Sequence, residues 1–152
     1  MTNELYPTEV LDPDYDDGTM PANVATLAES VVGHRIVKAE KRVEDIPAYR
    51  GATYTRRRSW FAITIDDGRE VRLADTSDCC AYTDLDAFLL HPERVDHVIM
   101  GVGTTDNYTR WHVYADMGDV LELTVGWSCG NPFYYGYGFD IDVIDLESTD
   151  DS

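Results

Sequence analysis

The sequence predicts an α+β domain, in which about seven strands form a mainly antiparallel sheet or a partly open barrel built from hairpins, with two short helices. Apolar and polar residues alternate over several strand-length segments. Two pairs of these segments are joined by the same Asp-x-Gly signature, at residues 66–68 and 116–118, which is typical of tight hairpin loops. At 152 residues, the chain has the size of one domain.

Three regions follow from composition. Residues 1–22 are polar, acidic and interrupted by prolines, so we predict a flexible N-terminal arm there. Residues 23–145 form the single globular domain, and residues 146–152 form an acidic tail. The domain begins with a short helix over residues 26–33, because Thr26 and Glu29 have the spacing of a capping box and Gly33 is placed to end it.

The next segments are predicted as strands separated by a long loop. Residues 35–43 alternate as a strand, and residues 44–57 carry Pro47, Gly51 and mixed charges, which favour a loop. Residues 60–65 and 71–74 then form a hairpin. A three-residue loop with Gly68 in the left-handed conformation sets the apolar faces against each other, with Ile63 opposite Val71 and Phe61 opposite Leu73.

The second half begins with a predicted helix over residues 83–91. Thr83 and Asp86 mark its start, Pro92 stops it, and its apolar side is formed by Leu85, Phe88 and Leu89. Residues 95–102 are interpreted as a buried strand that leads into a turn over residues 101–106.

The clearest hairpin joins residues 108–115 to residues 120–127. A three-residue loop, residues 116–118, pairs Val113 with Leu121 and Trp111 with Leu123. It also sets His112 across from Glu122, which we interpret as a cross-strand pair on the surface. Residues 139–143 alternate as the last strand, with an acidic outer face.

The charge is distributed unevenly. The formal net charge is -17, but residues 1–20 and 140–152 each hold six acids and no base. Ten of the twelve bases lie between Arg35 and Arg72, including the triplet Arg56 to Arg58. The overall negative field opposes a polyanion, so we expect no nucleic-acid partner. The longest apolar runs have strand length and the N-terminus lacks the features of a secretory signal, which predicts a cytoplasmic protein without a membrane span.

The three cysteines, Cys79, Cys80 and Cys129, are interpreted as free thiols. Together with one of His91, His97 or His112 they would supply four zinc ligands. Adjacent cysteines reach one ion poorly, however, and the chain has no Cys-x-x-Cys pair. We therefore predict neither a metal nor a cofactor.

An enzymatic alternative uses the same residue types. A pocket lined by Cys79, Cys80, His97, His112 and Cys129 would combine a thiol nucleophile with a histidine base. No family-specific motif surrounds either of the adjacent cysteines, so this small-molecule or enzymatic domain is the second hypothesis, and we predict no catalytic residue.

The stretch from Trp127 to Phe139 holds six of the seventeen aromatic residues together with three glycines. Its two ends fall on the apolar faces of the flanking strands, which leaves residues 130–138 as the candidate recognition surface. The predicted binding residues are Trp127, Asn131, Phe133, Tyr134, Tyr135 and Tyr137.

Three motifs resemble a known family: residues 78–84 (Asp-Cys-Cys-Ala-Tyr-Thr-Asp), residues 95–106, and residues 126–139 (Gly-Trp-Ser-Cys-Gly-Asn-Pro-Phe-Tyr-Tyr-Gly-Tyr-Gly-Phe). The chain resembles a family of small acidic proteins of unknown function from actinobacterial phages and actinobacteria. The resemblance covers roughly residues 30–143, without the termini and residues 44–58. It implies a phage or prophage accessory protein in the bacterial cytoplasm, and it assigns no catalytic residue.

The leading hypothesis is therefore a non-enzymatic phage accessory protein that binds a host macromolecule, most directly a host protein, through the Gly/Tyr-rich surface. The acidic periphery would speed its encounter with a basic partner. A third hypothesis is a minor component of the virion.

Overall fold

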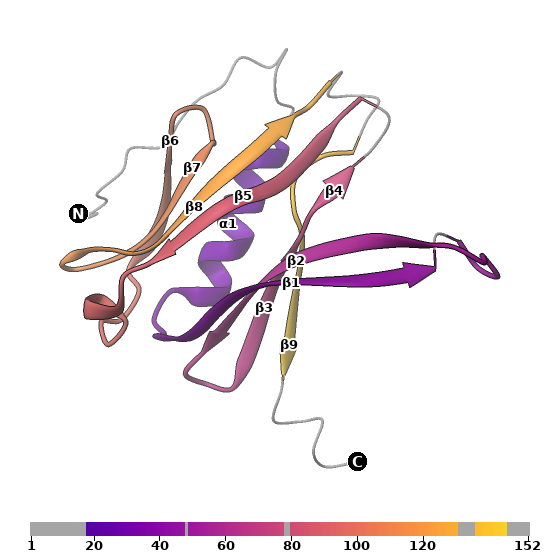
Figure 1. Ribbon diagram of the computed structural model, residues 1–152. Helices are drawn as coiled ribbons and strands as arrows, with labels where there is room; N and C mark the ends of the chain where they lie inside the picture. Colours follow the sequence, from indigo (N-terminus) through magenta and orange to yellow (C-terminus); the bar gives the residue numbers. More distant parts are fainter. Residues whose placement is uncertain (1–17, 48, 78–79, 131–135, 146–152) are drawn as a thin grey trace.

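The computed structural model describes residues 18–47, 49–77, 80–130 and 136–145, which form two antiparallel sheets and one α-helix (Figure 1). The first sheet has the strand order β1-β2-β3-β9, and the second has the order β4-β5-β8-β7-β6. The strands are β1 (Ile36–Pro47), β2 (Thr55–Ile65), β3 (Arg69–Ala74), β4 (Thr76–Ser77), β5 (Tyr82–Leu90), β6 (Gly101–Thr105), β7 (Arg110–Ala115), β8 (Gly118–Ser128) and β9 (Asp140–Asp145).

The predicted class of a mainly antiparallel domain is confirmed in outline. Within the described ranges, however, there are nine strands instead of about seven, one α-helix instead of two, and two sheets that are not closed instead of one sheet or a partly open barrel. A short 3-10 helix, η1 (Pro92–Arg94), follows β5.

Helix α1 (Thr19–Val31) lies between the two sheets and contacts β6 of one and β9 of the other (Figure 1). It begins inside the segment that we interpreted as an arm. Pro21 does not prevent this, because the N–H groups of the first helical turn have no intrahelical partner. Thr26 is therefore interior, and its hydroxyl donates to the carbonyl oxygen of Ala22 at 3.0 Å. The predicted end is confirmed, since Gly33 follows the helix with a φ of 88°.

The second predicted helix, over residues 83–91, is wrong, because this segment is β5 and pairs with β8. Leu85 and Phe88 are three residues apart, a spacing that favours a helix. In the strand, a β-bulge at Asp86 inserts one extra residue, so both side chains lie on the same face of the sheet. A bulge thus imitates helical spacing.

The two predicted hairpin registers are confirmed: Ile63 pairs with Val71, Phe61 with Leu73, Val113 with Leu121, and Trp111 with Leu123. The first loop also has the predicted conformation, with a φ of 89° at Gly68. The second loop differs, because Ala115 pairs with Gly118 and only two residues turn the chain. The extra residue is Val120, which forms a bulge in β8.

The strand predicted over residues 95–102 is wrong over most of its length, because β6 begins only at Gly101. Ile99 is nevertheless buried. Its N–H donates to the carbonyl oxygen of His34, and its own carbonyl oxygen accepts from the N–H of Gly33. These bonds tie Ile99 to the residues that follow α1, and the next residue, Met100, donates its N–H to the carbonyl oxygen of Tyr114 in β7.

The long loop predicted over residues 44–57 is also wrong in large part. Strands β1 and β2 continue as a two-stranded ribbon beyond Trp60, the last residue of β2 in this direction that pairs with β3. We call residues 43–59 the β1–β2 arm; it projects from the body of the molecule (Figure 1). Pro47 fits because it is the last residue of an edge strand.

The core lies between the sheets and α1. Its largest fully buried side chains include Trp111, Phe61, Met20, Leu27, Ile63, Ile65, Leu73, Leu85, Ile99, Leu121 and Leu123. Phe139, just before β9, packs edge to face on Trp111 with ring centroids 5.3 Å apart. Among the described residues, no helix has both the length and the hydrophobicity needed to cross a bilayer.

Candidate functional site

The two described aromatic ends of the Gly/Tyr-rich stretch belong to the packed body. Tyr137 is 8% exposed and stacks on the half-buried Trp127, with ring centroids 5.9 Å apart and planes at 16°. Four of the predicted binding residues lie outside the described residues: Asn131, Phe133, Tyr134 and Tyr135. The described part of the stretch therefore anchors it to the core.

Trp127 also holds a strained turn. Asp106, Asn107 and Tyr108 are three consecutive residues with φ of 57°, 58° and 61°, a left-handed conformation that costs on the order of 1–3 kcal/mol at each non-glycine residue. Two indole N–H groups satisfy carbonyl oxygens of this turn, each at 2.8 Å: Trp127 bonds Asn107, and Trp111 bonds Tyr108. The turn is therefore fixed by tryptophans of β7 and β8.

The described members of the alternative Cys/His pocket do not form one group, because Cys80 and Cys129 lie at the same end of the β5–β8 pair, where Tyr82 stands opposite Ser128, but His97 does not. Cys80 is exposed just before β5, and Cys129 is buried just after β8, while Cys79 lies outside the described residues. His97 lies at the other end of β8, with Nδ1 2.8 Å from Oδ1 of Asp116 in the β7–β8 turn. An eleven-residue strand spans roughly 35 Å, so His97 and Cys129 are far apart.

His112 stands opposite Glu122 as predicted, but it is buried, with 7% of its surface exposed, so its interpretation as a surface pair is wrong. Its Nδ1 lies 2.9 Å from Oδ2 of Asp119, and its Nε2 lies 3.0 Å from the hydroxyl of Thr105. Glu122 instead contacts His91, with 2.6 Å between Oε2 and Nε2. We call His112, Asp119 and Glu122 the β7–β8 cluster. Their potential ligand atoms all lie within 4.8 Å of one another.

The bulge at Val120 creates this cluster. Residues three apart point to opposite faces of a regular strand, yet Asp119 and Glu122 both lie on the face of His112. The carbonyl oxygen of Val120 also accepts a hydrogen bond from the N–H of His91 at 2.8 Å. The bulge at Val120 thus positions the side chains of His91, His112, Asp119 and Glu122 relative to one another.

A second group of carboxylates lies over Gly126, where Asp84 and Asp86, two residues apart in β5, share one face of the sheet. A Cβ atom at Gly126 would lie 2.7 Å from Oδ1 of Asp84 and 3.1 Å from Oδ2 of Asp86, so glycine leaves room for both carboxylates. Burial raises the pKa of Asp84, and the hydrogen bond and charge of Asp86 raise it further. Burial also raises the pKa of Asp75, which accepts a hydrogen bond from the N–H of Leu85.

The outer face of the first sheet carries an alternating network of charges. The carboxylate of Glu70 is 1% exposed and accepts hydrogen bonds from two guanidinium groups: Nε of Arg72 at 2.6 Å and NH1 of Arg42 at 3.1 Å. Arg42 also pairs with Glu40 at 2.8 Å, and these hydrogen bonds raise the pKa of Arg42 and lower that of Glu40. Arg72 lies over the ring of Trp60, 5.5 Å from its centroid.

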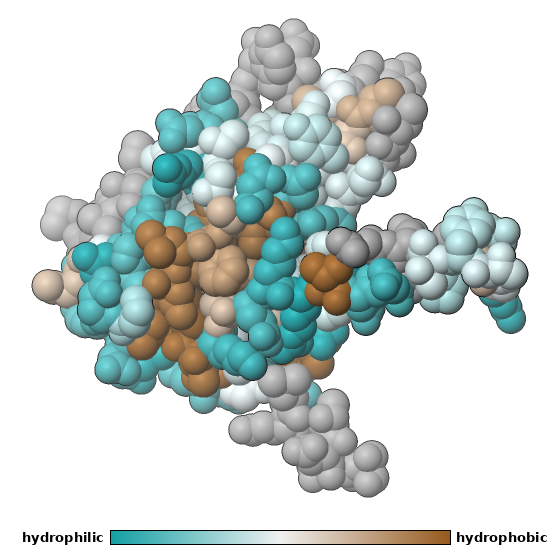
Figure 2. All heavy atoms as spheres, viewed as in Figure 1, coloured by the Kyte–Doolittle hydropathy of each residue, from teal (hydrophilic) through white to brown (hydrophobic). Residues whose placement is uncertain are grey.

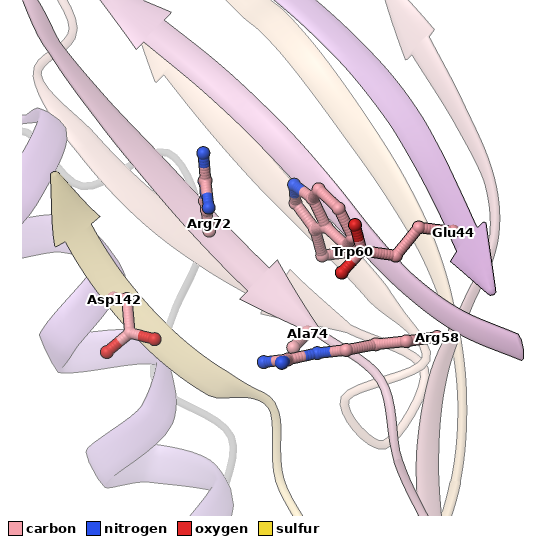
Figure 3. Close-up of a pocket in the computed structure, with 6 residues that line it drawn as sticks. All are labelled: Glu44, Arg58, Trp60, Arg72, Ala74 and Asp142. Carbon is pink, nitrogen blue, oxygen red and sulfur yellow. The ribbon is translucent and has the colours of Figure 1, made fainter. Parts of the chain in front are cut away.

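A small cavity opens beside this network, at the base of the β1–β2 arm. It is lined by Glu44, Arg58, Trp60, Arg72, Ala74 and Asp142 (Figure 3). Its volume is about 60 Å³. Pockets for organic ligands typically span roughly 300–1,000 Å³, and a water molecule occupies about 30 Å³. The cavity therefore has room for one or two waters or a small ion.

Most described residues of the β1–β2 arm are exposed. Residues 43–59 contain four arginines and two acids, a net charge of +2 in a protein of net charge -17. At its tip, the rings of Tyr49 and Tyr54 pack edge to face at 5.7 Å. Figure 2 shows that the coloured residues of the projecting ribbon are mainly hydrophilic.

Comparison with known proteins matches residues 29–141 to a family model described as a domain of unknown function, DUF7448. The chain belongs to the DUF7448 family. The expected membership in a family of unknown function is thus confirmed. The match spans the β1–β2 arm, the β7–β8 cluster and nearly all of both sheets. No curated protein and no solved structure matches this DUF7448 chain.

Sequence reasoning missed the arm as a projecting surface, and it named His91 only as an alternative partner of the cysteines, without the grouping of His112, Asp119 and Glu122. The signal for the arm was present, because Tyr49 and Tyr54 lie on either side of Gly51, as in the turn of a hairpin. Asp119 carried no signal, since its approach to His112 depends on the bulge at Val120. His91 comes from a segment that we predicted as helical.

Proposed function

We propose that this DUF7448 protein is a non-enzymatic binding protein, which contacts an acidic surface of another protein through the β1–β2 arm. The observation that carries the proposal is the projection of a basic, tyrosine-tipped ribbon from an acidic body. None of the residues of the hydrophobic core cluster comes from the described part of residues 43–59, which is consistent with an external contact for the ribbon.

Charge separation supports this function. Five paired residues on each strand carry the arm about 16 Å past the last β2–β3 pair. Salt screens exposed charges over about 8 Å at physiological ionic strength. Arg50, beyond the last paired residues of the arm, can therefore act on a partner with little interference from the acidic body, whereas Arg58 lies at the base of the arm near Asp142.

A protein partner fits the arm better than a nucleic acid. In the backbone register of the ribbon, Glu44 is paired with Arg58 and Asp45 with Arg57, so acidic positions stand opposite basic positions. A phosphate backbone would meet these acids unfavourably, whereas a protein surface can match both signs. The tyrosines of the tip are also common anchors at protein interfaces.

The backbone of the arm offers a second means of contact. β1 is the edge strand of its sheet, and β2 has no β3 residue beside it between Thr55 and Ser59 in the described pairing. Exposed strand edges of this kind accept an added strand from a partner. Backbone pairing would supply affinity, and the flanking side chains would supply selectivity.

The biological setting in the proposal rests on the family resemblance. We place the protein among the accessory proteins of phages or prophages, acting on a host protein in the bacterial cytoplasm. The Gly/Tyr-rich stretch, residues 130–138, stays a second candidate surface, and the same experiment tests it.

The test is affinity capture from a lysate of the bacterium that carries the gene, with the full-length protein as bait. The arm variant is Tyr49→Ala with Arg50→Ala and Tyr54→Ala. The matched control is Tyr82→Ala with Arg110→Ala, which removes an exposed tyrosine and an exposed arginine of the second sheet. A third bait carries Tyr134→Ala with Tyr135→Ala.

We expect the wild type and the control to retain the same proteins, and the arm variant to lose them. Capture that is unchanged in the arm variant contradicts the proposal. If only the Tyr134/Tyr135 variant fails to capture the proteins, the contact surface is the Gly/Tyr-rich stretch and not the arm. If nuclease treatment abolishes capture by the wild type, the partner is a nucleic acid and not a protein.

A further inference from the structure

The β7–β8 cluster combines one imidazole and two carboxylates at the spacing of metal ligands. Ions such as Zn²⁺ hold nitrogen and oxygen ligands at about 2.1 Å, which places neighbouring ligand atoms about 3.0–3.4 Å apart for coordination angles of roughly 90–109°. The observed 2.9 Å between Nδ1 of His112 and Oδ2 of Asp119 is close to this separation. The carboxylate of Glu122 completes a set whose ligand atoms lie within 4.8 Å.

The surroundings of the cluster hold its side chains in place. The hydroxyl of Thr105 lies 3.0 Å from Nε2 of His112, where it can accept the ring proton when Nδ1 is a ligand. His91 contacts Glu122 at 2.6 Å and is itself held by the backbone of Val120. Metal-binding histidines and carboxylates are usually oriented by such outer contacts.

The local charge favours a cation. Asp119 and Glu122 bring two carboxylates to one buried imidazole. Arg94 donates to the backbone carbonyl oxygen of Asp119, and NH1 of Arg110 forms a long ion pair with Glu122, 3.9 Å from its Oε1. A divalent cation would balance both acids.

Access to the cluster is also suitable. The side chains of Asp119 and Glu122 are 13% and 23% exposed, so an ion can enter from the outer face of the second sheet and keep bound water. Rigid paired strands carry all three ligands, which limits the reorganisation that binding requires.

From these observations we propose that His112, Asp119 and Glu122 bind one divalent transition-metal ion of mixed nitrogen and oxygen preference, of which Zn²⁺ is the probe. Three protein ligands leave at least one coordination position for water. The site is separate from the β1–β2 arm, so a negative result for metal binding would leave the proposed binding function untouched, and the reverse also holds.

The test is equilibrium dialysis of chelator-treated full-length protein against Zn²⁺, with the bound metal counted by mass spectrometry. We expect one ion per chain. Glu122→Gln and Asp119→Asn should each weaken binding by about tenfold or more, and His112→Gln should do the same. Circular dichroism checks the fold of each variant, and Glu122→Gln is the mildest because its side chain is partly exposed.

Two controls make the result specific. His97→Gln alters another histidine–carboxylate pair, at 2.8 Å from Asp116, and should leave binding unchanged. Replacement of all three cysteines with serine should also leave it unchanged. Absence of binding in the wild type, equal loss in His97→Gln, retention in folded Glu122→Gln and Asp119→Asn, or loss in the cysteine variant would overturn the proposal.

Discussion

Tyr49 and Tyr54 pack edge to face at the tip of the β1–β2 arm, with ring planes at 79°, while 60% and 59% of their surfaces stay exposed. Each ring thus holds the other in place and keeps an open face for a partner. Aromatic rings that are fixed before binding lose little conformational entropy when they bind. This arrangement explains how a narrow ribbon can present a defined surface.

Removal of these rings should affect binding much more than folding. We expect Tyr49→Ala with Tyr54→Ala to change the free energy of unfolding by less than about 1 kcal/mol, because both rings are mostly exposed and lie outside the core. Urea denaturation measures this change. A loss of several kcal/mol would show that the tip stabilises the fold instead.

Removal of the two arginines beside Glu70 should destabilise the fold more than removal of the charge of Glu70 itself, because only the Glu70 carboxylate is fully buried. Loss of Arg42 and Arg72 together leaves a charge that is 1% exposed without its cations, which should cost roughly 3–5 kcal/mol. Glu70→Gln leaves two arginines that are one-third exposed and can be hydrated, so about 1–2 kcal/mol is expected. Chemical denaturation of the double and single variants gives the order, and the reverse order would contradict this account.

The raised pKa of Asp84 leads us to expect that the stability of the protein depends on pH. Because burial and Asp86 raise its pKa above the ordinary value of 3.8, the folded state binds more protons than the unfolded state above that value. The contribution of Asp84 to stability is therefore present at low pH and is lost as the pH rises through the raised pKa.

Asp84→Asn should remove the loss of stability that follows ionisation of Asp84, because a neutral amide stays uncharged at every pH and can donate a hydrogen bond to Asp86. We expect the variant to be more stable than the wild type at about pH 7, with a difference that shrinks towards about pH 3.5. Urea unfolding at both pH values measures it. A variant that is destabilised equally at both would show that the raised pKa does not govern stability here.

The left-handed turn should become more stable when its strain is relieved. Asn107 is exposed and has a φ of 58°, so Asn107→Gly is expected to raise the free energy of unfolding by about 0.5–1 kcal/mol. Trp127→Phe should instead lower it, because the carbonyl oxygen of Asn107 loses its indole donor. Thermal unfolding of the two variants compares them, and equal effects of the same sign would refute this view of the turn.

The sequence allowed the hairpin registers to be predicted because alternation and loop length together leave one pairing that buries both apolar faces, as with Ile63 and Val71. It did not reveal the bulges. The bulge at Asp86 places the apolar residues Leu85 and Phe88 three positions apart, which is the spacing of a helix and not of a strand. The bulge at Val120 turns Asp119 to the face of the sheet that carries His112. Single inserted residues leave no mark in a pattern of hydrophobicity, although they determine which side chains meet.

The arm was misread for a related reason. Pro47 and Gly51 are loop formers, yet the proline ends an edge strand and the glycine adopts a φ of 84° within the turn between β1 and β2. Residues of such a ribbon bury little surface, so alternation between apolar and polar positions is weak there. Composition identified the basic cluster, and only the fold showed that it projects.

Site-specific photocrosslinking tests the proposed binding role of the arm most directly. A photoreactive phenylalanine derivative is placed at Tyr49 in one version of the full-length protein and at Tyr82, on the second sheet, in another. Both versions are expressed and irradiated in the bacterium that carries the gene. Our account predicts a discrete protein adduct from the Tyr49 position and none of the same size from the Tyr82 position. An adduct from Tyr82 alone, or the same adduct from both, would contradict the claim that the arm is the contact surface.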